Sequence, residues 1–279
     1  MSGANTDVDL QRRIATSRFR RKSGGSLRAT EERRLPPTVK VLECDPELGL
    51  RVPPEQVDRA RDALVAPVLV LEAGSWEPPI GPAQRRGLGY LVLGGILARD
   101  VVLAGNTSTE LLGEGDVLQP TAAVSDDRLV RCHVIWRVVE PVRLAALGES
   151  FARRLGEWPQ VQAALFERAI RRSLHMSIHQ ALLQLSPVET RLLVVFWYLA
   201  ERWGRVTPDG IVLRLRLSHR LLGQLVGSQR ASVTTALRRV VESGMVVRRP
   251  DATWLLRGSP PDELTRPHWP QRVAAGARG

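Results

Sequence analysis

The chain has 279 residues, of which 43% are hydrophobic and 25% charged, a composition typical of a folded protein with one or two domains. It carries 40 basic and 29 acidic side chains and only two cysteines, which excludes a disulfide framework and a metal site built from cysteines alone within one chain. The longest apolar runs, residues 88–98 and 192–200, are shorter than the roughly 18 residues of a membrane-spanning helix. The arginine-rich N-terminus has no apolar secretory core, so a cytoplasmic protein without a membrane partner is expected.

The positive charge is concentrated in two segments. Residues 1–40 carry ten basic and four acidic side chains and residues 205–257 carry ten and three, whereas residues 41–204 carry seventeen and twenty. We expect residues 1–40 to be a disordered basic arm, because they hold few large apolar side chains. This arm is either a variable extension or a DNA-contacting segment. Residues 259–279 are expected to be a flexible tail. The chain thus has basic ends around a nearly neutral middle, and this charge distribution indicates a polyanionic partner.

Residues 41–147 are predicted to form β structure. Short apolar stretches recur there, separated by Gly, Pro, Asn and Asp at turn positions. Between residues 130 and 138 apolar side chains alternate with Arg131, His133 and Arg137, which is the period of a strand with one buried face. No long helical pattern interrupts this region, which favours a sandwich or a barrel.

Helical spacing begins in residues 148–185. It predicts a helix from Pro159 to Gln184, which would be ~39 Å long at about 1.5 Å per residue. One face of such a helix often exceeds what a single β domain can cover, so we expect it to be a dimerisation helix. The alternative is a helix packed wholly on its own domain. The face expected at the dimer seam consists of Trp158, Gln162, Leu165, Ala169, Arg172 and Met176.

A further helix is predicted to start at Ser186-Pro187. Serine can cap a helix, proline is tolerated in its first turn, and Glu189 stands where a carboxylate reaches back toward the cap. Gly204 is expected to end this helix. Its aromatic side chains are expected to fill the core.

A strand, two short helices and a basic hairpin are predicted next. The strand covers residues 211–216. Ser218 is a suitable N-cap for the first helix, and Gly227 ends it, because glycine freely takes a positive φ. The second helix is expected to be capped near Ser228 and to cover residues 230–242.

Two strands, residues 245–247 and 253–256, would then form a wing with a basic tip. In the second helix one stripe is apolar and the rest carries arginine, glutamine, serine and threonine, which suit base edges and phosphates. Arginines at a wing tip suit phosphate or a minor groove. An ordinary amphipathic hairpin with a solvated charged face is the alternative. The residues expected to contact DNA are Ser218, His219, Arg220, Ser228, Gln229, Arg230, Ser232, Thr234, Thr235, Arg238, Arg239, Arg248 and Arg249.

Residues 217–233, LSHRLLGQLVGSQRASV, resemble the C-terminal domain of Crp/Fnr regulators, the cyclic-AMP receptor protein family. The closest features are LGQLVG at 222–227, an arginine just inside the second helix, and the ending Leu237-x-x-x-Val241-x-x-x-Met245. The order of β-rich domain, long helix and winged segment extends the resemblance over roughly residues 60–258. The resemblance implies an α+β fold with an N-terminal β-roll (double-stranded β-helix) over 41–147, a dimerisation helix over 148–185 and a C-terminal winged helix-turn-helix over 186–258.

The resemblance also implies roles for single residues. Arg230 matches the family's base-reading arginine, and Ser218 matches the phosphate-contacting residue that opens the first helix. Ala231 stands where many members have a glutamate and Thr235 where some have a second arginine, so a different operator is expected; Arg238 can compensate. The resemblance implies a bacterial transcriptional regulator rather than an enzyme. Its implied partners are double-stranded DNA, a second copy of the chain and RNA polymerase.

The turn LLGEGDVL at residues 111–118 resembles the lead to the family's phosphate-binding cassette. That cassette needs a glutamate for the ribose and an arginine with a small hydroxyl residue for the cyclic phosphate. The chain continues instead as QPTAAVSDDR, where Asp126 and Asp127 would repel a phosphate. We therefore do not expect a cyclic nucleotide, and the effector stays unidentified.

No cofactor or metal is predicted. His175 and His179 have the four-residue spacing of metal ligands on a helix, but no third ligand lies close in sequence. The family's oxygen-sensing iron–sulfur variant needs four cysteines, and haem at His133 or Cys132 is left open. Two other classes also stay open. One is an effector-binding or protein-interaction module whose winged segment docks to protein, and the other is an enzyme, for which we find no catalytic set.

Overall fold

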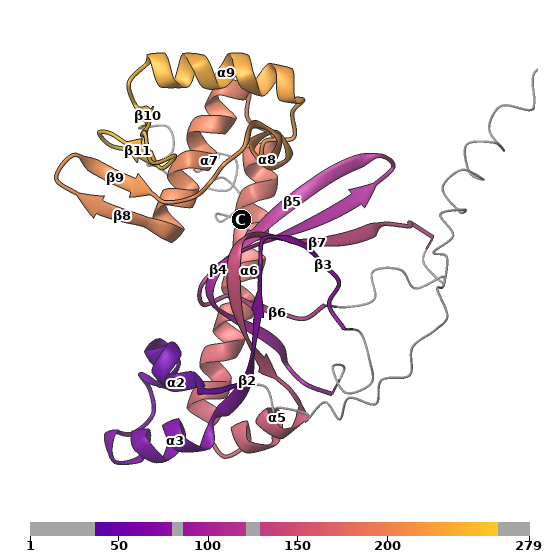
Figure 1. The fold of residues 1–279 in the computed structure, drawn as a ribbon, viewed down its shortest axis with the longest axis vertical. Coiled ribbons are helices and arrows are strands. Elements are labelled where there is room, and N and C mark those ends of the chain that lie inside the picture. Colours follow the sequence, from indigo (N-terminus) through magenta and orange to yellow (C-terminus); the bar gives the residue numbers. More distant parts are fainter. Residues whose placement is uncertain (1–36, 80–85, 121–128, 262–279) are drawn as a thin grey trace, which may run out of the picture. The chain divides into compact units, whose positions relative to one another are not determined.

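The apolar stretches of the N-terminal half form an antiparallel sheet in the computed structural model, which describes residues 37–79, 86–120 and 129–261 (Figure 1). The strands are β1 (Thr38–Lys40), β2 (Val65–Leu71), β3 (Gly74–Trp76), β4 (Gly89–Leu103), β5 (Asn106–Leu112), β6 (Val117–Leu118) and β7 (His133–Leu147). Their order is β1-β2-β7-β4-β5, with β3 paired to β7 and β6 paired to β4. We call these strands the N-terminal sheet.

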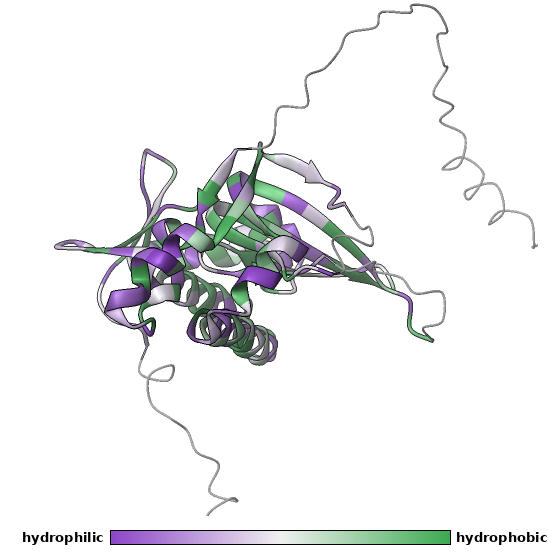
Figure 2. Ribbon diagram, turned by 90° about the horizontal axis from the view of Figure 1, so that it is seen from below, coloured by the Kyte–Doolittle hydropathy of each residue, from purple (hydrophilic) through white to green (hydrophobic). Residues whose placement is uncertain are grey.

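The two long strands β4 and β7 form the centre of this sheet. Each has 15 residues, and their register shifts between Val92 and Leu97. Gly95 lies at this irregularity with φ +84°, and a Cβ there would stand 2.0 Å from the carbonyl oxygen of Pro141. Only glycine fits such a close approach, and the resulting bulges bend both strands. The alternating colours along strands and helices in Figure 2 are those expected of elements with one buried face.

The beginning of the described chain differs from the sequence prediction. Residues 38–40, assigned above to the disordered arm, form β1 and pair with β2. Residues 41–64, assigned to β structure, are mostly helical: α2 (Val41–Cys44), two 3-10 turns (Pro46–Gly49 and Pro54–Gln56) and α3 (Val57–Ala63). Their few apolar side chains pack against the following helices, and this tertiary burial decides the conformation of segments too short to show a period. The rest of the predicted arm, residues 1–36, and the tail from residue 262 lie outside the described residues.

Two helices follow the sheet, α5 (Glu149–Leu155) and α6 (Pro159–Leu183). The predicted span of α6 is confirmed, and its proline occupies the first turn, where the missing N–H costs no hydrogen bond. Val161 and Leu165 pack into the core that α2, α3 and α5 share with one face of the sheet.

The remaining elements are α7 (Val188–Trp203), β8 (Gly204–Thr207), β9 (Gly210–Leu213), α8 (His219–Leu225), α9 (Arg230–Glu242), β10 (Val246–Arg248) and β11 (Trp254–Leu256). The four strands pair in the order β10-β11-β9-β8. The predicted helix over 230–242 and the predicted pair of strands at 245–247 and 253–256 are thus confirmed to within two residues.

Two boundaries and one strand in this half differ from the sequence prediction. Ser186 does not cap α7; Pro187 stands at the N-cap position without a side-chain cap bond, and Glu189 pairs with Arg239 of α9. The strand predicted at 211–216 ends at Leu213, and its hairpin partner β8 was not predicted. That partner has only four residues and follows directly on a helix, so it shows no pattern of its own.

One core joins the two halves. It contains Ile96, Ala98 and Leu111 of the N-terminal sheet together with buried side chains of α7, α8, α9 and β11. Phe196 and Trp254 lie at its centre with ring centroids 4.9 Å apart. The helices that carry the candidate site are therefore fixed to the rest of the protein by shared apolar burial.

Candidate DNA interface

The turn between α8 and α9 is set by one cap and two glycines. Ser218 caps α8 as predicted, since its Oγ accepts a hydrogen bond from the N–H of Leu221 at 3.1 Å. Gly227 ends the helix with φ +59°. A Cβ on Gly223 would stand 2.7 Å from the carbonyl oxygen of Ser228, so this glycine lets α8 approach the start of α9. Ser228 was predicted as the cap of α9, but Gln229 occupies that position, without a side-chain cap bond.

Helix α9 buries one stripe and exposes the opposite face. Val233, Ala236, Leu237 and Val240 are buried in the shared core. The exposed side chains are Arg230, Ala231, Ser232, Thr234, Thr235, Arg238, Arg239 and Glu242. Every residue of α9 that was predicted to contact DNA therefore lies on a solvent-facing surface.

Several of these polar side chains already have local partners. Thr234 Oγ1 donates to the carbonyl oxygen of Arg230 at 2.9 Å and lies 3.1 Å from Nδ1 of His219. Arg239 pairs with Glu189 of α7, and the pKa of Glu189 is lowered by its own backbone N–H and by Arg239. The guanidinium of Arg230 has no hydrogen bond or ion pair among the residues that the structure describes, so it is free to bind an outside acceptor.

The loop joining β10 and β11 presents the second basic group. Ala252 has φ +64°, and Asp251 accepts hydrogen bonds from the N–H and the Oγ1 of Thr253, which lower its pKa and fix the turn. Arg248 lies over the ring of Trp254, 5.6 Å from its centroid. Arg249 is exposed at the tip.

The opposite side of α8 is bound to the N-terminal sheet. Gln224 accepts a hydrogen bond from Nη2 of Arg137 at 3.1 Å, and Arg137 is held by Asp100 through contacts of 2.6 and 3.0 Å. The carbonyl oxygen of Leu225 lies 2.7 Å from Nε2 of His179 on α6. Sequence reasoning missed these contacts, because they join residues 46 and 87 positions apart and no local pattern marks them.

The face of α6 predicted for dimerisation packs largely on its own chain. Trp158 and Leu165 are buried in the core beside α5, Arg172 forms a two-point ion pair with Glu110 at 2.7 and 2.9 Å, and Met176 accepts from Nη2 of Arg99 at 3.7 Å. Gln162, Ala169 and Met176 are exposed, Met176 by 38%. Trp158 and Leu165 are thus covered within one chain, and the dimerisation face stays a prediction.

A different apolar stripe of α6 faces solvent. Phe166, Ile170 and Leu174 follow one another at four-residue spacing and are 67%, 54% and 59% exposed, and Ile178 continues the series. The helix thus has two apolar stripes. Sequence periodicity predicted only one apolar face on this helix, and it missed the second stripe.

The other candidate ligand groups do not assemble. Burial and the neighbouring Arg202 lower the pKa of His175, and within the described ranges no three His, Cys, Asp or Glu side chains are grouped to hold a metal. His133 is exposed at the start of β7. Residues 121–128, which include the two aspartates of the cassette region, lie outside the described residues. No described helix is both long and apolar enough to cross a membrane.

Comparison with known proteins identifies the class of fold. No family model matches the chain. The structure of FixK2 from Bradyrhizobium japonicum shares the fold with a TM-score of 0.54 at 17% identity, covering 69% of this chain and 93% of that one. A transcriptional regulator of the CRP/FNR family from Thermus thermophilus does so with a TM-score of 0.50 at 20% identity, covering 68% and 93%. The resemblance to Crp/Fnr regulators is thus confirmed, and the chain has their α+β fold.

The sequence also has named relatives. The global nitrogen regulator of Synechocystis sp. is 27% identical over 169 residues, which are 60% of this chain and 74% of the relative.

Proposed function

We propose that the chain is a sequence-specific, DNA-binding transcriptional regulator, with α8 and α9 as its helix-turn-helix and the β10–β11 hairpin as its wing. The observation that carries this proposal is the exposed polar face of α9, which is fixed by a buried apolar stripe and bears the unpaired Arg230. Arginine can make two-point contacts to guanine in the major groove. The basic excess of residues 205–257 supports a polyanion at this surface.

The proposal includes a division of the chain. The N-terminal sheet corresponds to the family's β-roll, α6 to the dimerisation helix, and residues 186–258 to the winged helix-turn-helix domain. Two copies would meet along the stripe of Phe166, Ile170 and Leu174 on α6. Two-fold symmetry then calls for an imperfect palindrome with half-sites ~34 Å apart. RNA polymerase is the further partner that a transcriptional regulator of this kind requires.

Selection from a pool of random duplexes tests the proposal. The full chain is expected to enrich a motif made of two inverted half-sites, and its affinity for that motif should fall steeply as salt rises. A protein whose winged segment docks to protein would enrich no motif over the input pool. That result would contradict the proposed function.

The dimer is tested separately through Ile170→Glu. A carboxylate in the middle of the seam would have to lose its hydration there, so we expect a dimer to become a monomer by sedimentation. Ile135→Glu is the matched control, because Ile135 is an exposed apolar residue of β7 away from α6. Equal sedimentation of the wild type and both variants would contradict the seam.

A further inference from the structure

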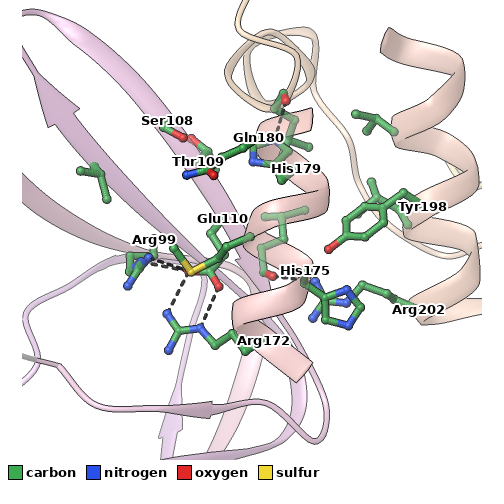
Figure 3. Close-up of a pocket in the computed structure, with 16 residues that line it drawn as sticks. Arg99, Ser108, Thr109, Glu110, Arg172, His175, His179, Gln180, Tyr198 and Arg202 are labelled. Atoms are coloured by element: carbon green, nitrogen blue, oxygen red, sulfur yellow. Dashed lines mark hydrogen bonds and ion pairs between the residues drawn. The ribbon is translucent and has the colours of Figure 1, made fainter. Parts of the chain in front are cut away.

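A cavity of about 220 Å³ lies between the β4–β5 hairpin and helices α6, α7 and α8 (Figure 3). It is larger than the roughly 150 Å³ apolar cavity that accommodates benzene in an engineered protein. Its polar lining includes Arg99, Glu110, Arg172, His175 and Tyr198. Of the turn at residues 111–118, which resembles the lead to the phosphate cassette, only Leu111 lines it.

The wall of this cavity has one positive charge more than its acid can balance. Glu110 is shared by two guanidiniums: Arg172 contacts it at 2.7 and 2.9 Å, and Nε of Arg99 lies 3.0 Å from its Oε2. Burial would raise the pKa of Glu110, but Arg172 and Arg99 hold it below its ordinary value, so the carboxylate stays ionised. Arg202, on the far wall, is balanced by Asp116 at 2.7 Å. The surplus charge therefore belongs to the Arg99–Arg172 pair.

Arg99 is the arginine that lacks a good acceptor. Its Nε is buried without a hydrogen bond among the described residues, despite its closeness to Glu110, and its Nη2 contacts only the sulfur of Met176, at 3.7 Å. Sulfur is a weak acceptor. A half-buried guanidinium whose buried Nε has no hydrogen bond gains most from an added anion, because charge-assisted hydrogen bonds are the strong ones.

The rest of the lining is apolar and aromatic. Its apolar side chains include Val101, Leu111, Met176, Val195, Leu199 and Leu225. The rings of His175 and Tyr198 meet edge to face with centroids 5.6 Å apart. Burial lowers the pKa of His175, which keeps the imidazole neutral at pH 7, and its buried Nδ1 has no partner in the described part of the chain. These surfaces suit a flat hydrocarbon body next to a single anionic group.

We propose that this cavity binds a small monocarboxylate with an aromatic body, its carboxylate on Arg99. The ligand would touch the N-terminal sheet and helix α8 at once, because residues of the β4–β5 hairpin and Leu225 of α8 both line the cavity. Binding therefore favours the arrangement in which α8 is held on the sheet, and by linkage it changes the affinity for DNA. The regulatory half of this proposal rests on the proposed function, and the binding half does not.

Calorimetry on the full chain tests the binding half, with phenylacetate as the probe and 2-phenylethanol as its neutral counterpart. We expect saturable binding of phenylacetate with one site per chain and about tenfold weaker binding of the alcohol, as the loss of one charge-assisted hydrogen bond predicts. Arg99→Met should weaken phenylacetate binding about tenfold for the same reason. Arg143→Met, an exposed arginine of β7 outside the lining, is the matched control and should leave binding unchanged.

Three results would overturn the site: no saturable phenylacetate binding up to about 10 mM, well above a weak millimolar affinity; equal binding of acid and alcohol; or equal binding by Arg99→Met and the wild type. If Arg99→Met fails to fold, Ser108→Trp replaces it, because Ser108 is exposed at the cavity rim and tryptophan there would obstruct entry.

The regulatory half is then measured as DNA affinity with and without saturating phenylacetate. Unchanged affinity would overturn the coupling alone, while the calorimetric result would stand even for a chain that binds no DNA.

Discussion

The protein contains two kinds of arginine. In and around α6 and α7, Arg168, Arg172 and Arg202 each contact a carboxylate within 2.7 Å and are largely buried. On α9 and the wing, Arg230 and Arg249 are exposed, and neither guanidinium forms a hydrogen bond or an ion pair in the described residues. The same residue type thus ties α6 and α7 to the N-terminal half of the chain in one region and stays available in the other. Net charge alone does not separate these two roles. The positions of the acids separate them, because a carboxylate contacts each of the three buried arginines.

The largest change in stability is expected when a paired arginine is removed. Arg172→Met leaves Glu110 with Arg99 as its remaining basic contact, and we expect a loss of about 2–3 kcal/mol in the free energy of unfolding, less than for a fully buried pair because some solvent reaches this one. Urea unfolding measures it. The control is Arg238→Met, whose pair with Glu242 spans 3.7 Å at the surface and should be worth less than about 0.5 kcal/mol. Equal losses in the two variants would remove the distinction between the two kinds of arginine.

Removal of an exposed, unpaired arginine should instead weaken DNA binding and change stability little. Arg230→Ala is expected to cost about 1–3 kcal/mol in binding to the selected motif and to relax one base position, with little change in stability. Fluorescence anisotropy on the selected and a scrambled duplex measures both effects. A loss of the same size on both duplexes would make Arg230 a phosphate contact only.

The wing should contribute affinity without sequence preference. Arg249→Ala is expected to weaken binding to every duplex by a similar factor and to reduce the slope of log affinity against log salt by about one, since one phosphate contact disappears. Salt titrations of the variant and the wild type supply this slope. An unchanged slope would place the wing away from DNA.

The smallest expected effect concerns His175. Because the folded protein holds the pKa of His175 below its ordinary value of 6.5, unfolding takes up a proton as the pH falls below about 6.5. The stability that the neutral imidazole contributes is therefore present above that pH and is lost as the pH falls through the lowered pKa. His175→Phe should have a shallower decline in stability from about pH 7.5 to 5 than the wild type. Parallel urea-unfolding profiles would contradict this assignment.

The sequence predicted the parts of the fold whose causes are local. The cap at Ser218, the break at Gly227 and the bounds of α9 follow from residue types and helical period, and the structure has them. The helical stretch 41–64 and strand β8 were missed because both are short and their conformation depends on tertiary packing. The exposed face of α9 was predictable because the helical period of its apolar residues shows which side is buried, and the remaining residues face solvent.

The remaining features depend on contacts between distant residues. Which stripe of α6 the sheet covers, the bond from Arg137 to Gln224, and the cavity beside Arg99 all arise when segments 60 or more positions apart meet. Charge counts alone do not distinguish Arg172 from Arg230. Only the position of Glu110 opposite α6 separates them.

Cross-linking of α9 to DNA tests the central claim most directly. In a chain carrying Cys44→Ser and Cys132→Ser, Thr235→Cys places a thiol on the exposed face of α9, and Ser150→Cys places one on the exposed surface of α5. Each variant is mixed with the selected duplex bearing a thiol tethered in the major groove. The account predicts a disulfide cross-link for Thr235→Cys and none for Ser150→Cys. Equal yields for the two variants, or a cross-link only at Ser150→Cys, would contradict it.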